Sequence, residues 1–267
     1  MQQMTFMECV KHAWGSAWEA LTRMPALVLG TFVAYAVLGW LGLAGRPVPG
    51  EGDVPSAGLV LAANLASMLN ALVYVWFTLK VYRFVLLDEG TTPLMAAGAK
   101  PLARIVGLGV VMMLALVGIA AAFWLVLRPR HEGGVGFLSL IVGAIWVFIG
   151  VRLSLLYPSL AIGGHFTLGA AWRDSRGHFW SVLGVSCVAA LPLIVCGVAA
   201  LIGLGLAGVT PKTVQTPTWF TALAIGQSVV NIAFALLTST ALAWLYRRYA
   251  NELANSGNSG GKSGGIR

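Results

Sequence analysis

Long apolar segments separated by short polar ones dominate the pattern of this chain. A helix that crosses the hydrocarbon core of a bilayer needs about 20 predominantly apolar residues. Six windows have that length, namely 25–44, 57–79, 105–127, 135–156, 179–207 and 219–246. The pattern therefore predicts an all-α fold, a polytopic transmembrane helical bundle with about six spans.

Composition and charge support a membrane protein. Of the 267 residues, 58% are hydrophobic and only 10% are charged, whereas a soluble domain carries about 25% charged residues. A soluble chain so poor in charge would expose large apolar patches and aggregate. Arg152 is the one basic residue inside a predicted span, and it lies close enough to the end of the fourth span to snorkel to the membrane surface.

The basic residues also predict the orientation. With six spans, the two termini and the second and fourth connections share one side, and we count thirteen Lys and Arg there against four on the other. Cytoplasmic loops are enriched in Lys and Arg, so we predict that both termini are cytoplasmic. The first apolar run begins near Met24 without a convincing cleavage site, which predicts an uncleaved span. The net charge of +8 indicates attraction to anionic lipid headgroups, and no nucleic-acid partner is expected.

Three segments that precede the odd-numbered spans resemble one another. Residues 17–30 read AWEALTRMPALVLG, residues 171–184 read AWRDSRGHFWSVLG, and residues 94–107, midway between them, read LMAAGAKPLARIVG. We predict a single transmembrane domain, 1–250, built from three repeats, 5–80, 91–157 and 167–248. The Gly/Ser/Asn-rich tail, 251–267, is predicted to be disordered. Shared topology without duplication would also explain the similarity.

Each repeat is predicted to begin with an amphipathic helix in the membrane interface, so that such helices precede spans 1, 3 and 5. Apolar residues recur at helical spacing in the first of them, at Phe6, Val10, Trp14, Trp18 and Leu21. The predicted N-terminal caps are Thr5 with Glu8, Ser16 with Glu19, Thr92 and Thr167.

Residues that could carry chemistry are sparse. His165, His178, Asp174 and Glu19 lie in surface segments with no nucleophile or second carboxylate beside them, so we expect no catalytic residues, no metal site, no cofactor and no enzyme activity. Cys187 and Cys196 are interpreted as small core residues rather than a disulfide or metal pair. The GxGxxG text at residues 203–208 ends an apolar helix, which favours close helix packing over nucleotide binding.

Two groups of residues remain as candidate sites. The polar residues of spans two and six form either interhelical hydrogen bonds or a polar intramembrane site, and they are Asn64, Asn70, Gln227 and Asn231. Pro192 could kink the fifth span, as in some transporters. The candidate lipid-contacting residues at the membrane surface are Arg23, Lys100, Arg152, Trp172, Arg173 and Arg176.

The most distinctive stretch runs from Arg152 to Gly184 and reads RLSLLYPSLAIGGHFTLGAAWRDSRGHFWSVLG, in which Gly163 and Gly164 predict a bend. It resembles the YciC-like family of uncharacterised bacterial six-span inner-membrane proteins, and it is similar to the membrane domain of some glycerophosphodiester phosphodiesterases. Neither resemblance implies an agreed reaction or a catalytic residue. The first resemblance implies a multi-pass protein of a bacterial cytoplasmic (inner) membrane. We therefore expect a non-catalytic membrane component that acts through membrane lipids, a membrane protein partner or a homo-oligomer. The alternative is a transporter or channel for a small or lipid-like substrate.

Overall fold

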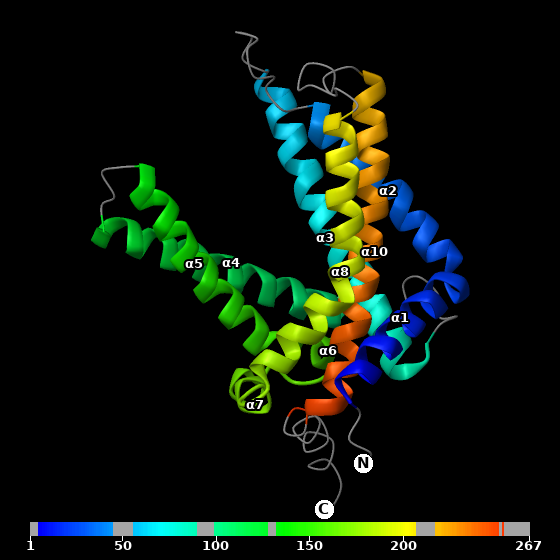
Figure 1. The fold of residues 1–267 in the computed structure, drawn as a ribbon, viewed down its shortest axis with the longest axis vertical. Helices are drawn as coiled ribbons and strands as arrows, with labels where there is room; N and C mark the ends of the chain where they lie inside the picture. The colour runs from blue at the N-terminus through cyan, green and yellow to red at the C-terminus, as the bar shows by residue number, and fades with distance from the viewer. Residues whose placement is uncertain are drawn as a thin grey trace, which may run out of the picture. The chain divides into compact units, whose positions relative to one another are not determined.

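The structure is a computed structural model that describes residues 5–44, 56–89, 99–127, 132–206, 217–250 and 253. The all-α prediction is confirmed, because the elements in these ranges are helices. In chain order they are α1 (Phe6–Arg23), α2 (Pro25–Ala44), α3 (Ala57–Leu87), α4 (Ala99–Leu127), α5 (Glu132–Leu153), α6 (Leu156–Ala161), α7 (Leu168–Asp174), α8 (Phe179–Leu206) and α10 (Pro217–Tyr249) (Figure 1).

Among the described residues, five helices are long and apolar enough to cross a membrane: α2, α3, α4, α8 and α10. The fourth predicted span corresponds to α5, whose apolar part covers Ser139–Leu153. The helices α2 and α3 begin where the sequence predicts. The helix α3 ends later than predicted, at Leu87 rather than at residue 79. This set of helices is compatible with a multi-pass membrane protein.

The chain divides into two compact units, which are described separately. The α1–α3 unit comprises residues 5–96 and 185–241, and the α4–α7 unit comprises residues 1–4, 97–184 and 242–267. The helices α8 and α10 contribute residues to both. The single domain and the threefold repeat stay predictions.

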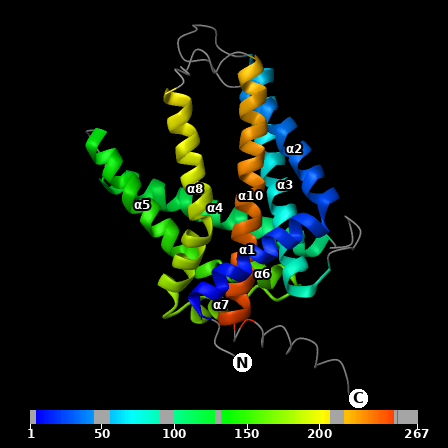
Figure 2. The ribbon, with the colours of Figure 1, turned by 45° about the vertical axis from the view of Figure 1, so that its right-hand side comes forward.

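In the α1–α3 unit, α1 begins at a capping box, as predicted. The Thr5 side chain accepts a hydrogen bond from the Glu8 backbone N–H, and the Glu8 carboxylate accepts one from the Thr5 N–H over 2.6 Å. The second predicted box is wrong, because α1 is continuous through Ser16. The chain turns sharply at Met24, and Pro25 opens α2, a position where its missing N–H costs nothing (Figure 2).

The helices α2 and α3 lie side by side in the same unit (Figures 1 and 2). On α10, Ala224 lies against α2, where a Cβ added to Gly39 would meet its methyl group at 3.9 Å. A side-chain hydrogen bond between Tyr74 and Thr238 joins α3 to α10. The Arg83 guanidinium forms a two-pronged ion pair with Glu89, at 2.8 and 2.9 Å, beyond the end of α3.

In the α4–α7 unit, a glycine turn ends α6 and confirms the predicted bend. Gly163 has a φ of +92°, its N–H bonds the Leu160 carbonyl, and the Gly164 N–H reaches back to the Ser159 carbonyl over 2.9 Å. This pair of bonds is the Schellman arrangement, which satisfies carbonyls left free at a helix end. The Arg104 guanidinium of α4 donates to the Gly164 carbonyl over 3.1 Å and so fixes the turn.

The C-terminal end of α10 is also part of the α4–α7 unit. The Tyr249 and Ser181 hydroxyls are 2.7 Å apart, and the Tyr249 ring stacks on His178 with ring centroids 4.3 Å apart. Leu253, which the sequence assigns to the disordered tail, is buried and donates its N–H to the Asp174 carboxylate over 3.0 Å. The other residues of the predicted tail lie outside the described residues.

The structure corrects two predictions for α8. Cys187 and Cys196 are exposed, and Cys9 of α1 is the buried cysteine, because α8 also exposes the apolar side chains next to the two thiols, Val188 and Val195. The proposed close packing at Gly203 and Gly205 is not found, since a Cβ at either position would meet nothing within 4 Å.

Of the two predicted helices before spans 3 and 5, the second can be compared with the structure. Ahead of α8 lies α7, but the Thr167 side chain makes no cap hydrogen bond, because its backbone does not have the extended conformation of an N-cap. The predicted cap at Thr92 lies outside the described residues.

Candidate functional site

The surface of α1 is divided into three stripes. Successive residues turn by about 100° around a helix, so the buried, apolar-exposed and polar positions can be assigned to sides. The side that packs into the protein consists mainly of small residues: Cys9, Val10, Ala13, Ala17 and Ala20. The adjacent side exposes bulky apolar residues: Met7, Trp14, Trp18 and Leu21, of which Trp18 is 69% exposed. The third side carries Glu8, Lys11, His12 and Glu19. A helix with protein, hydrocarbon and water on successive sides fits the plane of a membrane surface.

An apolar pocket of about 600 Å³ opens in the α1–α3 unit where α1 turns into α2. Every side chain that lines it is apolar, from α1, α2 and α10: Leu21, Pro25, Ala26, Val28, Leu29, Phe32, Val229, Ile232, Ala233 and Leu236. The volume is typical of ligand pockets. These lining residues are not among the sequence-predicted sites, because only packing brings residues 21–32 beside residues 229–236.

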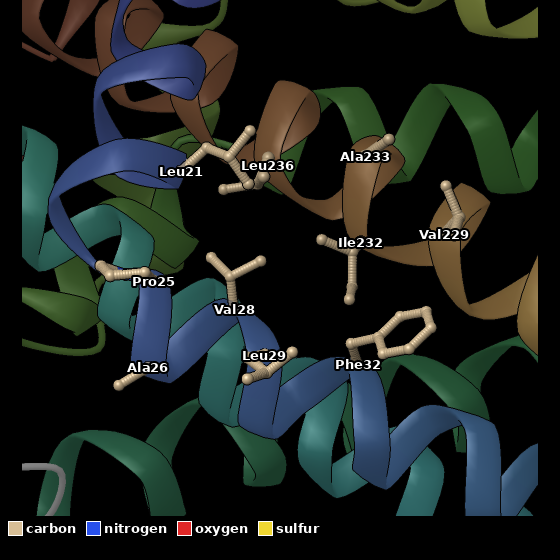
Figure 3. A pocket seen from close by; sticks show the side chains of 10 residues that line it. All are labelled: Leu21, Pro25, Ala26, Val28, Leu29, Phe32, Val229, Ile232, Ala233 and Leu236. Atoms are coloured by element: carbon tan, nitrogen blue, oxygen red, sulfur yellow. The ribbon is translucent and has the colours of Figure 1, made fainter.

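Side chains from the two walls of the pocket point toward each other (Figure 3). Val28 of α2 faces Ile232 of α10, and Leu21 lies close to Leu236. Ile232 and Leu236 are nearly fully buried, whereas Leu29 and Val229 are exposed at the rim. The pocket is therefore a cleft with a packed floor and an apolar mouth, and its wall offers no hydrogen-bonding side chain to a ligand.

The four predicted intramembrane polar residues all belong to the α1–α3 unit, outside this pocket. Asn64 and Gln227 are exposed, and Gln227 donates to the Asn231 side chain one turn along α10 over 2.9 Å. Asn70 is partly buried, and its side-chain oxygen has no hydrogen-bond partner. A shared site for these four residues stays a prediction.

Two further polar groups in this unit are buried without partners, and neither is among the predicted site residues. Tyr35 is only 2% exposed and its hydroxyl is unpartnered, as is the hydroxyl of Ser239. Buried polar groups without a partner are rare in proteins and require a reason. A tyrosine in the middle of an apolar run was the available signal.

The candidate surface cations occupy several environments. Arg23 pairs with Glu19 at 2.7 Å and with Asp88 at 3.6 Å, and this places the end of α1 beside the end of α3. Lys100 is exposed in the first turn of α4. Arg173 and Arg176 are exposed on α7 and in the turn that follows it. Their role in lipid binding stays a prediction.

Arg152 and Trp172 are brought together in the α4–α7 unit. The guanidinium carbon of Arg152 is 5.2 Å from the ring centre of Phe148 and 5.3 Å from that of Trp172. The two rings meet edge-to-face with centroids 5.9 Å apart, and Phe179 extends the cluster from Phe148 at 5.3 Å. The Arg152 Nε and Nη1 atoms are buried with no hydrogen-bond partner.

Comparisons with known proteins found no match. The chain matches no family model, no curated protein and no solved structure. The residues that the structure describes also contain no group of three His, Cys, Asp or Glu side chains able to hold a metal ion. The proposed function therefore rests on the residues and contacts of this chain.

Proposed function

We propose that this protein is a non-catalytic component of a bacterial inner membrane that binds membrane lipid through the apolar pocket of the α1–α3 unit. The observation that carries the proposal is that all ten residues lining this pocket are apolar. Pockets for polar ligands include a few polar groups that fix the ligand's orientation. A wall without such groups suits a hydrocarbon chain.

The place of the pocket in the fold supports an acyl chain as the occupant. Leu21 and Pro25, at one end of the pocket, belong to the turn between α1 and α2. The three stripes of α1 favour a position in the membrane interface, with Trp18 facing hydrocarbon. A pocket that opens beside such a helix lies at the depth where the acyl chains of a lipid begin.

The test is to fill the pocket. Ala233→Phe places a ring in the space between α2 and α10, whereas Ala222→Phe, on an exposed position of the same helix, is the matched control. Native mass spectrometry of protein released from nanodiscs measures the lipid that resists detergent. We expect retained lipid in the wild type and in Ala222→Phe, and its loss in Ala233→Phe. Equal retention in all three would refute lipid binding at this pocket.

The buried polar groups of the α1–α3 unit favour transport as a second candidate. The Tyr35 hydroxyl, the Ser239 hydroxyl and the Asn70 side-chain oxygen could hydrogen-bond a neutral polar solute inside the bilayer. Glycerol influx into proteoliposomes, followed by light scattering, tests this idea. Faster influx than in empty liposomes, slowed by Tyr35→Phe, would support transport, and influx equal to that of empty liposomes would refute it for this class of solute.

Orientation and kinship are proposed on the sequence pattern alone. The excess of basic residues on one side supports cytoplasmic termini. The stretch from Arg152 to Gly184 supports kinship with the YciC-like inner-membrane proteins. Protease digestion of tags at each end, in inverted and right-side-out vesicles, would show which side of the membrane holds the termini.

A further inference from the structure

The guanidinium of Arg152 has buried donors without hydrogen-bond acceptors. Its Nε and Nη1 atoms are buried without a partner, and no ion pair among the described residues involves Arg152. A guanidinium keeps its charge in proteins, and all of its polar hydrogens are donors. Buried charged donors without acceptors are costly, so this arrangement calls for an acceptor from outside the described residues.

The aromatic neighbours of Arg152 cannot supply that acceptor, but they determine where it would bind. The guanidinium carbon and the ring centres of Phe148 and Trp172 lie 5.2, 5.3 and 5.9 Å from one another. Seen from Arg152, the two rings therefore cover one side of the guanidinium. Ring faces attract the positive charge without accepting its N–H groups as an oxygen would. The rings hold in place a planar fork of donors that matches the geometry of an oxyanion, and the oxyanion would have to enter beside the rings to reach the buried Nε and Nη1 atoms.

We propose that Arg152 binds the phosphate group of a membrane lipid. Arg152 lies in the last turn of the apolar helix α5, and Trp172 beside it is 42% exposed. Exposed tryptophans at the ends of apolar helices lie at headgroup level in membranes, which is where lipid phosphates are found. Arg173 and Arg176, both exposed, follow Trp172 in the chain and add positive charge. This inference adds the chemistry of the headgroup to the proposed lipid binding. It rests on that proposed function, because the proposed function makes a lipid the source of the phosphate.

The decisive comparison uses purified, delipidated full-length protein and three probes. These are phosphatidylglycerol, diacylglycerol with the same acyl chains, and inorganic phosphate, with affinity measured by native mass spectrometry. Arg152→Met removes the guanidinium, and the control Arg247→Met removes an exposed charge of the same unit that lies over the ring of Trp244. We expect Arg152→Met to weaken phosphatidylglycerol binding about ten- to hundredfold, the loss of one or two charge-assisted hydrogen bonds, and Arg247→Met to have little effect. Arg152→Lys, which keeps charge without the planar fork, should be intermediate.

Each outcome is decisive. If Arg152→Met also abolishes binding of inorganic phosphate, the site accepts free phosphate as well as lipid; if the wild type binds the lipid alone, the lipid is the source. Equal affinity of wild type and Arg152→Met for phosphatidylglycerol would overturn the proposal. Diacylglycerol has no phosphate, so its retention reports on the apolar pocket alone. If diacylglycerol is retained and Arg152→Met has no effect on phosphatidylglycerol binding, the phosphate site fails; if diacylglycerol is not retained, the proposed function fails.

Thermal unfolding distinguishes a binding role from a structural one. If Arg152 only packs α5 against α7, Arg152→Met lowers the unfolding temperature and leaves the effect of added lipid unchanged, which would count against the proposal. If Arg152 binds phosphate, the delipidated variant is at least as stable as wild type, since a costly unpartnered charge is gone. In that case phosphatidylglycerol stabilises the wild type more than the variant, in which only the apolar pocket still binds lipid.

Discussion

Replacing Gly164 with alanine tests the turn that ends α6. A Cβ at this position would lie 2.8 Å from the Ser159 backbone oxygen and closer still to the Ser159 hydroxyl. The hydroxyl can rotate away, but the backbone oxygen cannot, because it accepts the hydrogen bond from Gly164 itself. The turn must therefore open to admit the methyl group.

The cost follows from the contacts that the opening disturbs. The Gly164 N–H bond to Ser159, at 2.9 Å, is lost or stretched, which is worth about 1 kcal/mol. The Arg104 guanidinium donates to the carbonyl of the displaced residue over 3.1 Å, and losing that charge-assisted bond at an exposed site adds about 1 kcal/mol. We expect Gly164→Ala to lower the free energy of unfolding by about 2 kcal/mol.

The assay is unfolding of the detergent-solubilised protein by SDS titration, followed by circular dichroism. Gly169→Ala is the matched control, because that glycine lies in the helix α7 with open space around its Cβ position. Alanine there should stabilise by about 0.5–1 kcal/mol, through helix propensity. Gly163→Ala should cost about 1 kcal/mol for its φ of +92°. If Gly164→Ala and Gly169→Ala unfold at the same SDS concentration, the reasoning about the turn is refuted.

Three further predictions follow from individual contacts. The backbone hydrogen bond from Thr5 holds the pKa of Glu8 below its usual range. The stabilisation by the Glu8 carboxylate is therefore complete above the ordinary glutamate pKa and is lost as pH falls through the lowered value. Thermal unfolding should show a stability gap between wild type and Glu8→Gln at pH 7 that narrows as the pH falls below the ordinary glutamate pKa, and a constant gap would contradict the cap. Tyr249→Phe removes the 2.7 Å hydrogen bond with Ser181 and should lower the free energy of unfolding, measured by SDS titration, by about 1 kcal/mol. An unchanged midpoint of the SDS titration would argue against that hydrogen bond. N-ethylmaleimide in detergent should label the two exposed α8 thiols before unfolding and the buried Cys9 only afterwards, as counted by intact mass spectrometry; early labelling of Cys9 would show that α1 is not packed as described.

Local and periodic signals in the sequence were sufficient for much of the fold. Apolar runs of the right length give the starts of α2 and α3 at Pro25 and Ala57. The capping pair of Thr5 and Glu8 and the bend at residues 163–164 are decided by residues within one turn of each other. The same local reasoning failed at Ser16, because a serine followed by a glutamate three residues later matches a capping box even where α1 continues through it, with Ala13, Ala17 and Ala20 buried on one face.

The candidate sites depend on contacts between distant segments, which the sequence pattern does not contain. The pocket exists because residues 25–32 pack near residues 229–236. Arg152 was predicted to reach a membrane surface, but its neighbours could not be predicted, since Phe148 and Trp172 meet only when α5 packs against α7. The orphaned hydroxyl of Tyr35 could not be foreseen either, because burial of a tyrosine does not reveal whether a partner lies opposite.

The charge balance of the chain supports the proposal that Arg152 binds a lipid phosphate. Seventeen Lys and Arg face only nine Asp and Glu, so at least eight basic side chains cannot have a carboxylate of their own. Arg104, for example, donates to backbone carbonyls. Arg152 lies beside the rings of Phe148 and Trp172, and its Nε and Nη1 atoms have no acceptor. For a chain whose long helices are apolar enough to cross a membrane, lipid phosphate is the abundant acceptor at the helix ends, and it would meet the demand of Arg152 without a carboxylate from the protein.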